Sequence, residues 1–107
     1  MLLPTIVQGA MGLVSGGAHI FGHEIRAIFK AFAEGDNQRA KELFVPIYRF
    51  CKSTGQNGRI LPNSILRPAI ELVTGIHLGP ARSPLAPATE EEMAVTTAIL
   101  REIGKLN

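Results

Sequence analysis

The sequence predicts a mostly α-helical protein with one short strand near its N-terminus. From residue 20 onward, apolar residues recur at three- and four-residue steps, which is the spacing of amphipathic helices. Before them lies Gly9-Ala10-Met11-Gly12-Leu13-Val14-Ser15-Gly16-Gly17, an uncharged stretch with a short apolar run. Such a run, bounded by glycine, is typical of a buried strand. We therefore expect a bundle of about four helices preceded by a strand at residues 12–15.

That strand has an unusual requirement. The backbone N–H and C=O groups of a buried strand need partners on both sides. No other segment of this chain has the pattern of a strand, and 107 residues make one domain at most. We therefore expect residues 12–15 to find partners beyond this chain, so that the chain is part of something larger.

The first half of the chain predicts a short helix and two long ones. Residues 2–8 suit a short helix, because Pro4 is tolerated in a first turn. A long helix is expected over residues 20–34, with Gly35 as its left-handed stop and Asp36 as the cap of the next helix. Its inward residues are Ile20, Phe21, Ile25, Ile28, Phe29 and Phe32.

The helix that follows is expected over residues 37–53. Pro46 lies inside it, but the apolar period continues past the proline, so we expect a kink and not a break. The residues predicted to face inward are Ala40, Leu43, Phe44, Ile47, Phe50 and Cys51.

The second half predicts two further helices. One covers residues 61–74 and ends at Gly75, with Ile65, Leu66, Ala69, Ile70, Leu72 and Val73 inward. Residues 78–87 are rich in proline and must lie extended over a surface. Thr89 and Glu92 then have the spacing of a capping box. The last helix is expected to run to about Gly104, with Met93, Thr97, Leu100 and Ile103 along one side.

Composition excludes several functional classes. The net charge is +2 and the basic residues are scattered among acids, which argues against a nucleic-acid partner. No apolar run approaches the roughly 18–20 residues of a membrane span, and the N-terminus lacks the basic region of a signal peptide. The single cysteine, Cys51, excludes an internal disulfide, so a reducing cytoplasm is the expected location.

Several residues are candidates for chemistry, and each has a simpler structural interpretation. Ser15 follows Gly12 by three positions, whereas a nucleophile elbow needs a spacing of two. His19 and His23 are four apart, but no third ligand completes a metal site. The glycine-rich stretch before a helix has the geometry of an anion cradle, yet it matches neither common phosphate-binding motif. No catalytic set assembles, and we predict no metal and no cofactor.

The stretch at residues 9–15 resembles the last barrel strand of the dihydrodipicolinate synthase / N-acetylneuraminate lyase family. The resemblance continues in order through residues 31–36, through Ala40-x-x-Leu43 and residues 43–47 with Pro46, through residues 82–87 and through the final helix. Members of this family are (β/α)₈ barrels with a C-terminal helical extension. They are class I aldolases and lyases that bind pyruvate as a Schiff base on a barrel lysine.

The resemblance implies that residues 1–107 are a single C-terminal fragment. Residues 1–35 would be the last barrel strand and helix, and residues 36–107 the helical extension. A whole barrel needs about 250 residues, and the family's catalytic lysine and tyrosine belong to earlier strands. We therefore expect the chain to be inactive alone and to meet pyruvate only in a complete enzyme. The one site residue implied is Val14, whose backbone carbonyl borders the substrate pocket in this family.

The acceptor, the partner and the function each stay open. The family's Asn-Pro-x-Pro-x-Lys run is replaced here by Leu61-Pro62-Asn63-Ser64-Ile65-Leu66-Arg67, so the aldol acceptor is not assigned. The partner is either a second copy of the chain or the missing part of the barrel. The alternative function is that of a small helical protein-interaction module without catalysis.

Overall fold

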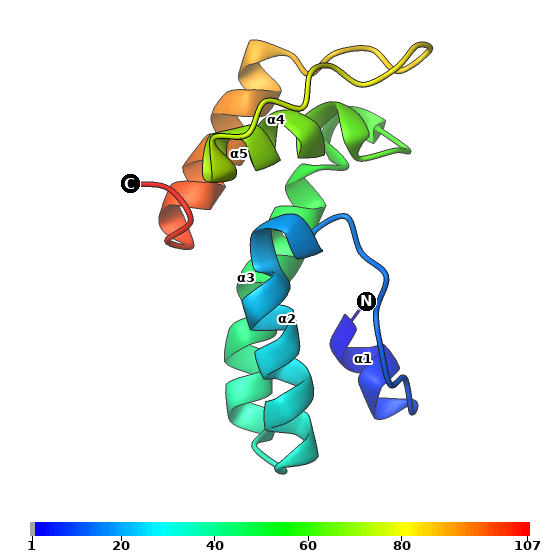
Figure 1. The fold of residues 1–107 in the computed structure, drawn as a ribbon, viewed down its shortest axis with the longest axis vertical. Helices are drawn as coiled ribbons and strands as arrows, with labels where there is room; N and C mark the ends of the chain where they lie inside the picture. Colours follow the sequence, from blue (N-terminus) through cyan, green and yellow to red (C-terminus); the bar gives the residue numbers. More distant parts are fainter. Residues whose placement is uncertain (1) are drawn as a thin grey trace. The chain divides into compact units, whose positions relative to one another are not determined.

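The computed structural model describes residues 2–107, and every regular element in that range is helical (Figure 1). The elements are α1 (Leu2–Val7), α2 (Ala18–Ala33), α3 (Asn37–Ser53), the short 3₁₀ helix η1 (Gln56–Gly58), α4 (Asn63–Thr74) and α5 (Glu90–Glu102). The mostly helical fold class is therefore confirmed. The chain divides into two compact units at the Tyr48–Arg49 boundary, and each is described by itself.

The predicted strand at residues 12–15 does not form. Residues 10–15 have no regular structure, and nothing else in the described range hydrogen-bonds to the backbone of residues 11–14. The side chains of Met11 and Val14 are 96% and 103% exposed. An extended segment becomes a strand only when a neighbouring backbone completes its ladder. The described residues supply no such neighbour.

In the first unit, α1 packs against α2. The buried face of α2 is largely as predicted, although Phe29 and Phe32 are only half-buried. Its buried residues are Ile20, Phe21, Ile25, Ile28 and Ala31. The predicted stop and cap are both confirmed: Gly35 has a φ of 78°, and an Asp36 carboxylate oxygen accepts a 3.0 Å hydrogen bond from the Arg39 amide.

Helix α3 runs through Pro46 without a break, as predicted. Ala40, Ile47 and Phe50 are buried, but the prediction that Cys51 faces inward is wrong, because Cys51 is exposed. The cysteine lies at the edge of the apolar stripe, where the periodicity alone does not decide burial.

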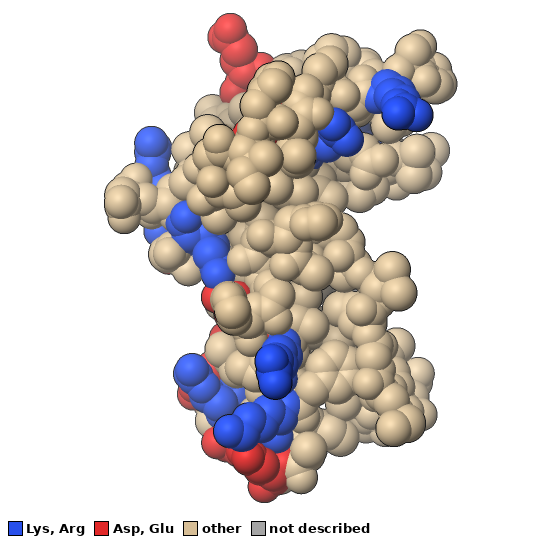
Figure 2. Space-filling view, in the orientation of Figure 1, with Lys and Arg blue, Asp and Glu red and all other residues tan. Residues whose placement is uncertain are grey.

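Charged side chains of both signs lie side by side over α2 and α3 (Figure 2). Lys30 and Glu34 are 3.9 Å apart, and Arg39 and Glu42 are 3.6 Å apart. All four side chains are more than half exposed. Exposed pairs of this kind add little to stability, so the apolar faces hold this unit together.

In the second unit, α4 packs against α5 (Figure 1). Ile65, Leu66, Ala69 and Ile70 of α4 are buried, while Leu72 is 47% exposed, contrary to the prediction. The predicted stop, Gly75, has a φ of 72°.

The buried face of α5 differs from the prediction by one residue. Glu92, Thr96 and Leu100 are buried, whereas Met93, Thr97 and Ile103 are half-buried. The capping box of Thr89 and Glu92 is confirmed. The face is shifted because Glu92 turns inward to pair with Arg59.

The segment between α4 and α5 has no regular secondary structure, as its prolines predict. It is held at Leu78 and Gly79 by side chains of α4, and at Ala86 and Pro87 by Arg59. These hydrogen bonds hold the segment in a defined position on the surface of the unit. No described helix is long and apolar enough to cross a membrane.

Candidate functional site

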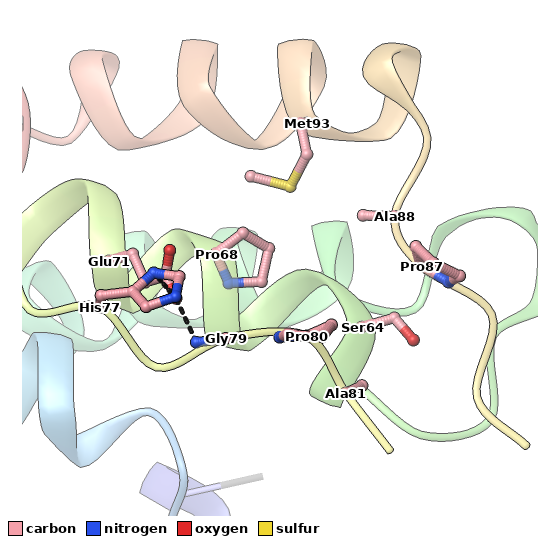
Figure 3. A pocket seen from close by; sticks show the side chains of 10 residues that line it. All are labelled: Ser64, Pro68, Glu71, His77, Gly79, Pro80, Ala81, Pro87, Ala88 and Met93. Atoms are coloured by element: carbon pink, nitrogen blue, oxygen red, sulfur yellow. Dashed lines mark hydrogen bonds and ion pairs between the residues drawn. The ribbon is translucent and has the colours of Figure 1, made fainter. Parts of the chain in front are cut away.

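A pocket of about 270 Å³ lies in the second unit between α4, the segment after it and the start of α5 (Figure 3). Most of its wall is apolar, formed by Pro68, Pro80, Ala81, Pro87, Ala88 and Met93. Glu71 and His77 lie at one end, and Ser64 lies toward the other. The pocket therefore combines an apolar wall with a carboxylate and an imidazole at one end.

Glu71 holds the loop that forms one wall of this pocket. Its Oε1 atom accepts hydrogen bonds from the amides of Leu78 (2.6 Å) and Gly79 (2.7 Å). His77 Nδ1 lies 3.3 Å from the same oxygen. These bonds, the Leu78 amide above all, lower the pKa of the Glu71 carboxyl. Glu71 is thus an ionised anchor and a poor proton acceptor.

Arg67 lies one turn before Glu71 on α4 and holds the same loop. Its Nε donates to the Gly79 carbonyl (3.0 Å), and Nη2 donates to the Leu78 carbonyl. Residues four apart on a helix share one face. Arg67 and Glu71 therefore bind both the carbonyls and the amides of residues 78 and 79.

Ser64 is a buried polar residue with an unusual environment. It is 4% exposed, and its Oγ has no hydrogen-bond partner among the described residues. Buried hydroxyls are ordinarily hydrogen-bonded. The Ser64 hydroxyl is thus a buried polar group whose hydrogen-bonding capacity is not used by the described residues.

A largely buried ion pair lies beside the wall made by Pro87 and Ala88. Arg59 Nε lies 2.7 Å from Glu92 Oε1, and Arg59 Nη2 lies 2.8 Å from Oε2. Glu92 also accepts from the Thr89 amide (2.8 Å) and the Asn57 side-chain amide (3.1 Å). The Arg59 hydrogen bonds, followed by that of Thr89, lower the pKa of Glu92 to about 2.

Arg59 also reaches the segment before α5. It donates to the carbonyls of Ala86 (3.0 Å) and Pro87 (2.7 Å). One guanidinium therefore joins η1, the proline-rich segment and the first turn of α5. It therefore fixes the part of the segment that carries Pro87 and Ala88, which line the pocket.

The residues singled out by the sequence lie elsewhere, in the first unit. Val14 is in the irregular segment and is fully exposed. Ser15 Oγ accepts from the Gly17 amide (3.1 Å), which occupies one amide that an anion cradle would use. His19 and His23 are both exposed, and in the described range no group of three metal-ligating side chains forms. His77, which is isolated in the sequence, lies with its Nδ1 atom 3.3 Å from the Glu71 carboxylate.

The roles of Arg59, Arg67 and Glu71 at the pocket were not predicted from the sequence. Arg67 and Glu71 carried one local signal, their four-residue spacing on a predicted helix just before a loop. Arg59 carried none, because its partner Glu92 is 33 positions away in the sequence.

Comparison with known proteins gives a consistent result. The profile of the dihydrodipicolinate synthetase family matches residues 1–103. The 4-hydroxy-tetrahydrodipicolinate synthase of Symbiobacterium thermophilum is 34% identical over 108 residues, covering 98% of this chain and 34% of the relative. The enzyme of the same name from Moorella thermoacetica is 32% identical, and the match covers 99% of this chain and 35% of the relative. The one from Synechococcus elongatus is 33% identical, and the match covers 97% of this chain and 33% of the relative. The chain thus spans about a third of the length of these relatives.

Proposed function

Because the chain belongs to the dihydrodipicolinate synthetase family, we propose that it is the C-terminal part of a pyruvate-dependent lyase and is inactive alone. The observation that carries the proposal is the match along nearly the whole chain to only a third of each relative. In the complete enzyme, pyruvate would form a Schiff base with a lysine supplied by the remainder of the barrel. This chain would contribute structure and one edge of the pocket.

The proposed division of labour follows the two parts of the sequence. Residues 1–35 would complete the barrel as its last strand and helix, and residues 36–107 would form the helical extension. The backbone carbonyl of Val14 would border the pyruvate pocket. Support comes from residues 11–14, whose backbone has no partner in the described range and whose Met11 and Val14 side chains are fully exposed.

The same exposed segment determines the proposed partners. Residues 10–15 would gain a strand ladder by joining the missing barrel strands, because their N–H and C=O groups are then satisfied. In the absence of those strands, the segment would pair with a second copy of the chain, as unpaired strand edges do.

Complementation tests the proposal directly. The chain is co-expressed with the N-terminal two thirds of the Moorella thermoacetica relative, and the product is examined by gel filtration, pyruvate-dependent condensation and borohydride trapping of pyruvate. We expect a stable complex that has activity and traps pyruvate on the N-terminal piece. The chain alone should do neither. Trapping of pyruvate by the chain alone would contradict its inactivity.

Two variants test whether the segment around Val14 makes the proposed contact. Val14→Lys puts a charge on the segment proposed to pair, and we expect it to abolish both complementation and self-association measured by light scattering. Ile60→Lys is the matched control, because Ile60 is 95% exposed but lies in the other unit. A wild-type chain that stays a monodisperse monomer, or equal effects of the two variants, would overturn the proposed contact.

We also propose that the protein works in the cytoplasm. The support is its cysteine usage: Cys51 is the single cysteine and is free and exposed, and free exposed thiols persist in reducing compartments. Fractionation of cells producing the protein tests this, and recovery outside the cytoplasmic fraction would contradict it.

A further inference from the structure

A second hollow, of about 440 Å³, lies between the start of α4 and residues 81–85. Two arginines, Arg67 and Arg82, line this hollow, and Asn63 and Ser83 add an amide and a hydroxyl. Leu61 and Leu85 form part of its apolar wall. No carboxylate is among its lining residues in the described part of the chain. We call it the Arg67/Arg82 hollow.

Within the described residues, no ion pair neutralises the two arginines of this hollow. Arg67 gives its two described hydrogen bonds to the carbonyls of Leu78 and Gly79, while Glu71, one turn away on α4, accepts from the amides of the same two residues. Arg82 is exposed, and its side chain has no hydrogen-bond or ion-pair partner within residues 2–107.

Both arginines project from defined backbone. Arg67 lies on α4 and is fixed by its two bonds to the loop. Arg82 precedes a turn that is closed by a 3.1 Å hydrogen bond from the Leu85 amide to the Arg82 carbonyl. The Arg67 side chain is therefore already ordered and loses little conformational entropy when a ligand binds, whereas the Arg82 side chain has yet to be ordered.

We propose that the Arg67/Arg82 hollow binds a small oxyanion, either a short dicarboxylate or a phosphate. The Arg82 guanidinium presents a planar fork of donors that matches carboxylate and phosphate oxygens, and Arg67 adds the N–H groups that are not bound to Leu78 and Gly79. The leucines of the hollow would contact a short carbon chain, while the amide of Asn63 and the hydroxyl of Ser83 would supply further hydrogen bonds. The proposal does not depend on the pyruvate chemistry proposed above.

The test uses the 107-residue chain with two probes, inorganic phosphate and succinate. Each is titrated by calorimetry and by amide NMR. We expect saturable shifts at Asn63, Arg82 and Ser83 with at least one probe, and the probe that saturates identifies the class of anion. Saturation with neither probe would overturn the proposal.

Three variants separate a built site from general electrostatic attraction. Arg82→Gln should weaken binding about tenfold or more, since it removes charge-assisted hydrogen bonds. Arg82→Lys keeps the charge but loses the fork, so a smaller loss is expected. Arg26→Gln removes the same charge from an exposed position of α2 and should leave affinity within about twofold.

Equal losses in Arg82→Gln and Arg26→Gln would show that only net charge matters and would overturn the proposal. Circular dichroism confirms that each variant is folded. If Arg82→Gln does not fold, the comparison of Arg82→Lys with Arg26→Gln decides in the same way. Because this test requires no turnover and no complementing piece, its outcome is independent of the complementation experiment.

Discussion

Arg59 and Glu92 form a two-point ion pair, with 2.7 Å and 2.8 Å contacts, in which the side chains are only 18% and 2% exposed. Arg49 and Glu102 form a second two-point pair, at 2.6 Å and 2.8 Å, with side chains 47% and 56% exposed. Arg49 uses Nη1 and Nη2, whereas Arg59 uses Nε and Nη2. The second unit thus contains a buried and an exposed arginine–glutamate pair, and the two can be compared.

Glu92→Gln should destabilise the second unit far more than Glu102→Gln. Glu92 is the shared acceptor for Arg59, Asn57 and the Thr89 amide, so its loss leaves a partly buried guanidinium without a counterion. We expect a thermal midpoint lower by about 5 °C or more for Glu92→Gln and within about 2 °C of wild type for Glu102→Gln. Calorimetry measures both. Equal shifts would mean that burial is not the deciding factor.

The stabilisation from Glu92 should disappear in acid. The pKa of Glu92 is about 2 in the folded chain, whereas an unperturbed glutamate has a pKa of about 4.3. A lowered folded-state pKa gives stability that is fully present above the unfolded pKa and is lost as pH falls through the folded one. The difference in thermal midpoint between wild type and Glu92→Gln should therefore be constant above about pH 5.5 and shrink toward pH 2. A difference that does not change with pH would contradict this.

Leu100→Ala should be strongly destabilising because Leu100 is fully buried. We expect a loss of roughly 2–5 kcal/mol in the free energy of unfolding, from lost burial and from the cavity that remains. Leu72→Ala is the control on α4, where the leucine is 47% exposed, and it should cost less than about 1 kcal/mol. Urea denaturation compares the two. A small effect of Leu100→Ala would show that the core repacks.

Two glycine-to-alanine changes should act in opposite directions. Gly75 caps α4 with a φ of 72°, and alanine there should cost about 1 kcal/mol because its Cβ disfavours the left-handed region. Gly22 lies inside α2 with no atom near an added Cβ, so alanine should stabilise by about 0.5–1 kcal/mol. Thermal unfolding gives both signs. Stabilisation by Gly75→Ala would contradict the assigned backbone role.

The elements that were predicted well are those decided by neighbouring residues. Gly35 and Asp36 end one helix and begin the next through contacts within a few positions. The capping box of Thr89 and Glu92 is local in the same way. Apolar spacing was sufficient to locate every long helix, because each buries one face.

The prediction for Cys51 failed because it lies at the edge of an apolar stripe, but three larger failures depend on groups that are not local in the sequence. Residues 12–15 have the composition of a strand, but a strand forms only beside a partner backbone, and the described residues supply none. The buried face of α5 moved by one position because Glu92 meets Arg59, a contact with no local signature. The candidate pocket was missed for the same reason: its walls are joined by Arg59, Arg67 and Glu71 across long loops.

The hydrogen bond from Asn57 to Glu92 has a consequence for how the protein ages. Asn57 is exposed, has a φ of 57° and is followed by Gly58, and asparagine before glycine is prone to spontaneous loss of its amide nitrogen. The product is a carboxylate where the Asn57 amide now lies 3.1 Å from Glu92 Oε1, and two carboxylates so close repel. Peptide mapping of stored protein should therefore find deamidation at Asn57, and the thermal midpoint of the same samples should fall. Slow deamidation of one exposed turn would in this way weaken the Arg59–Glu92 ion pair.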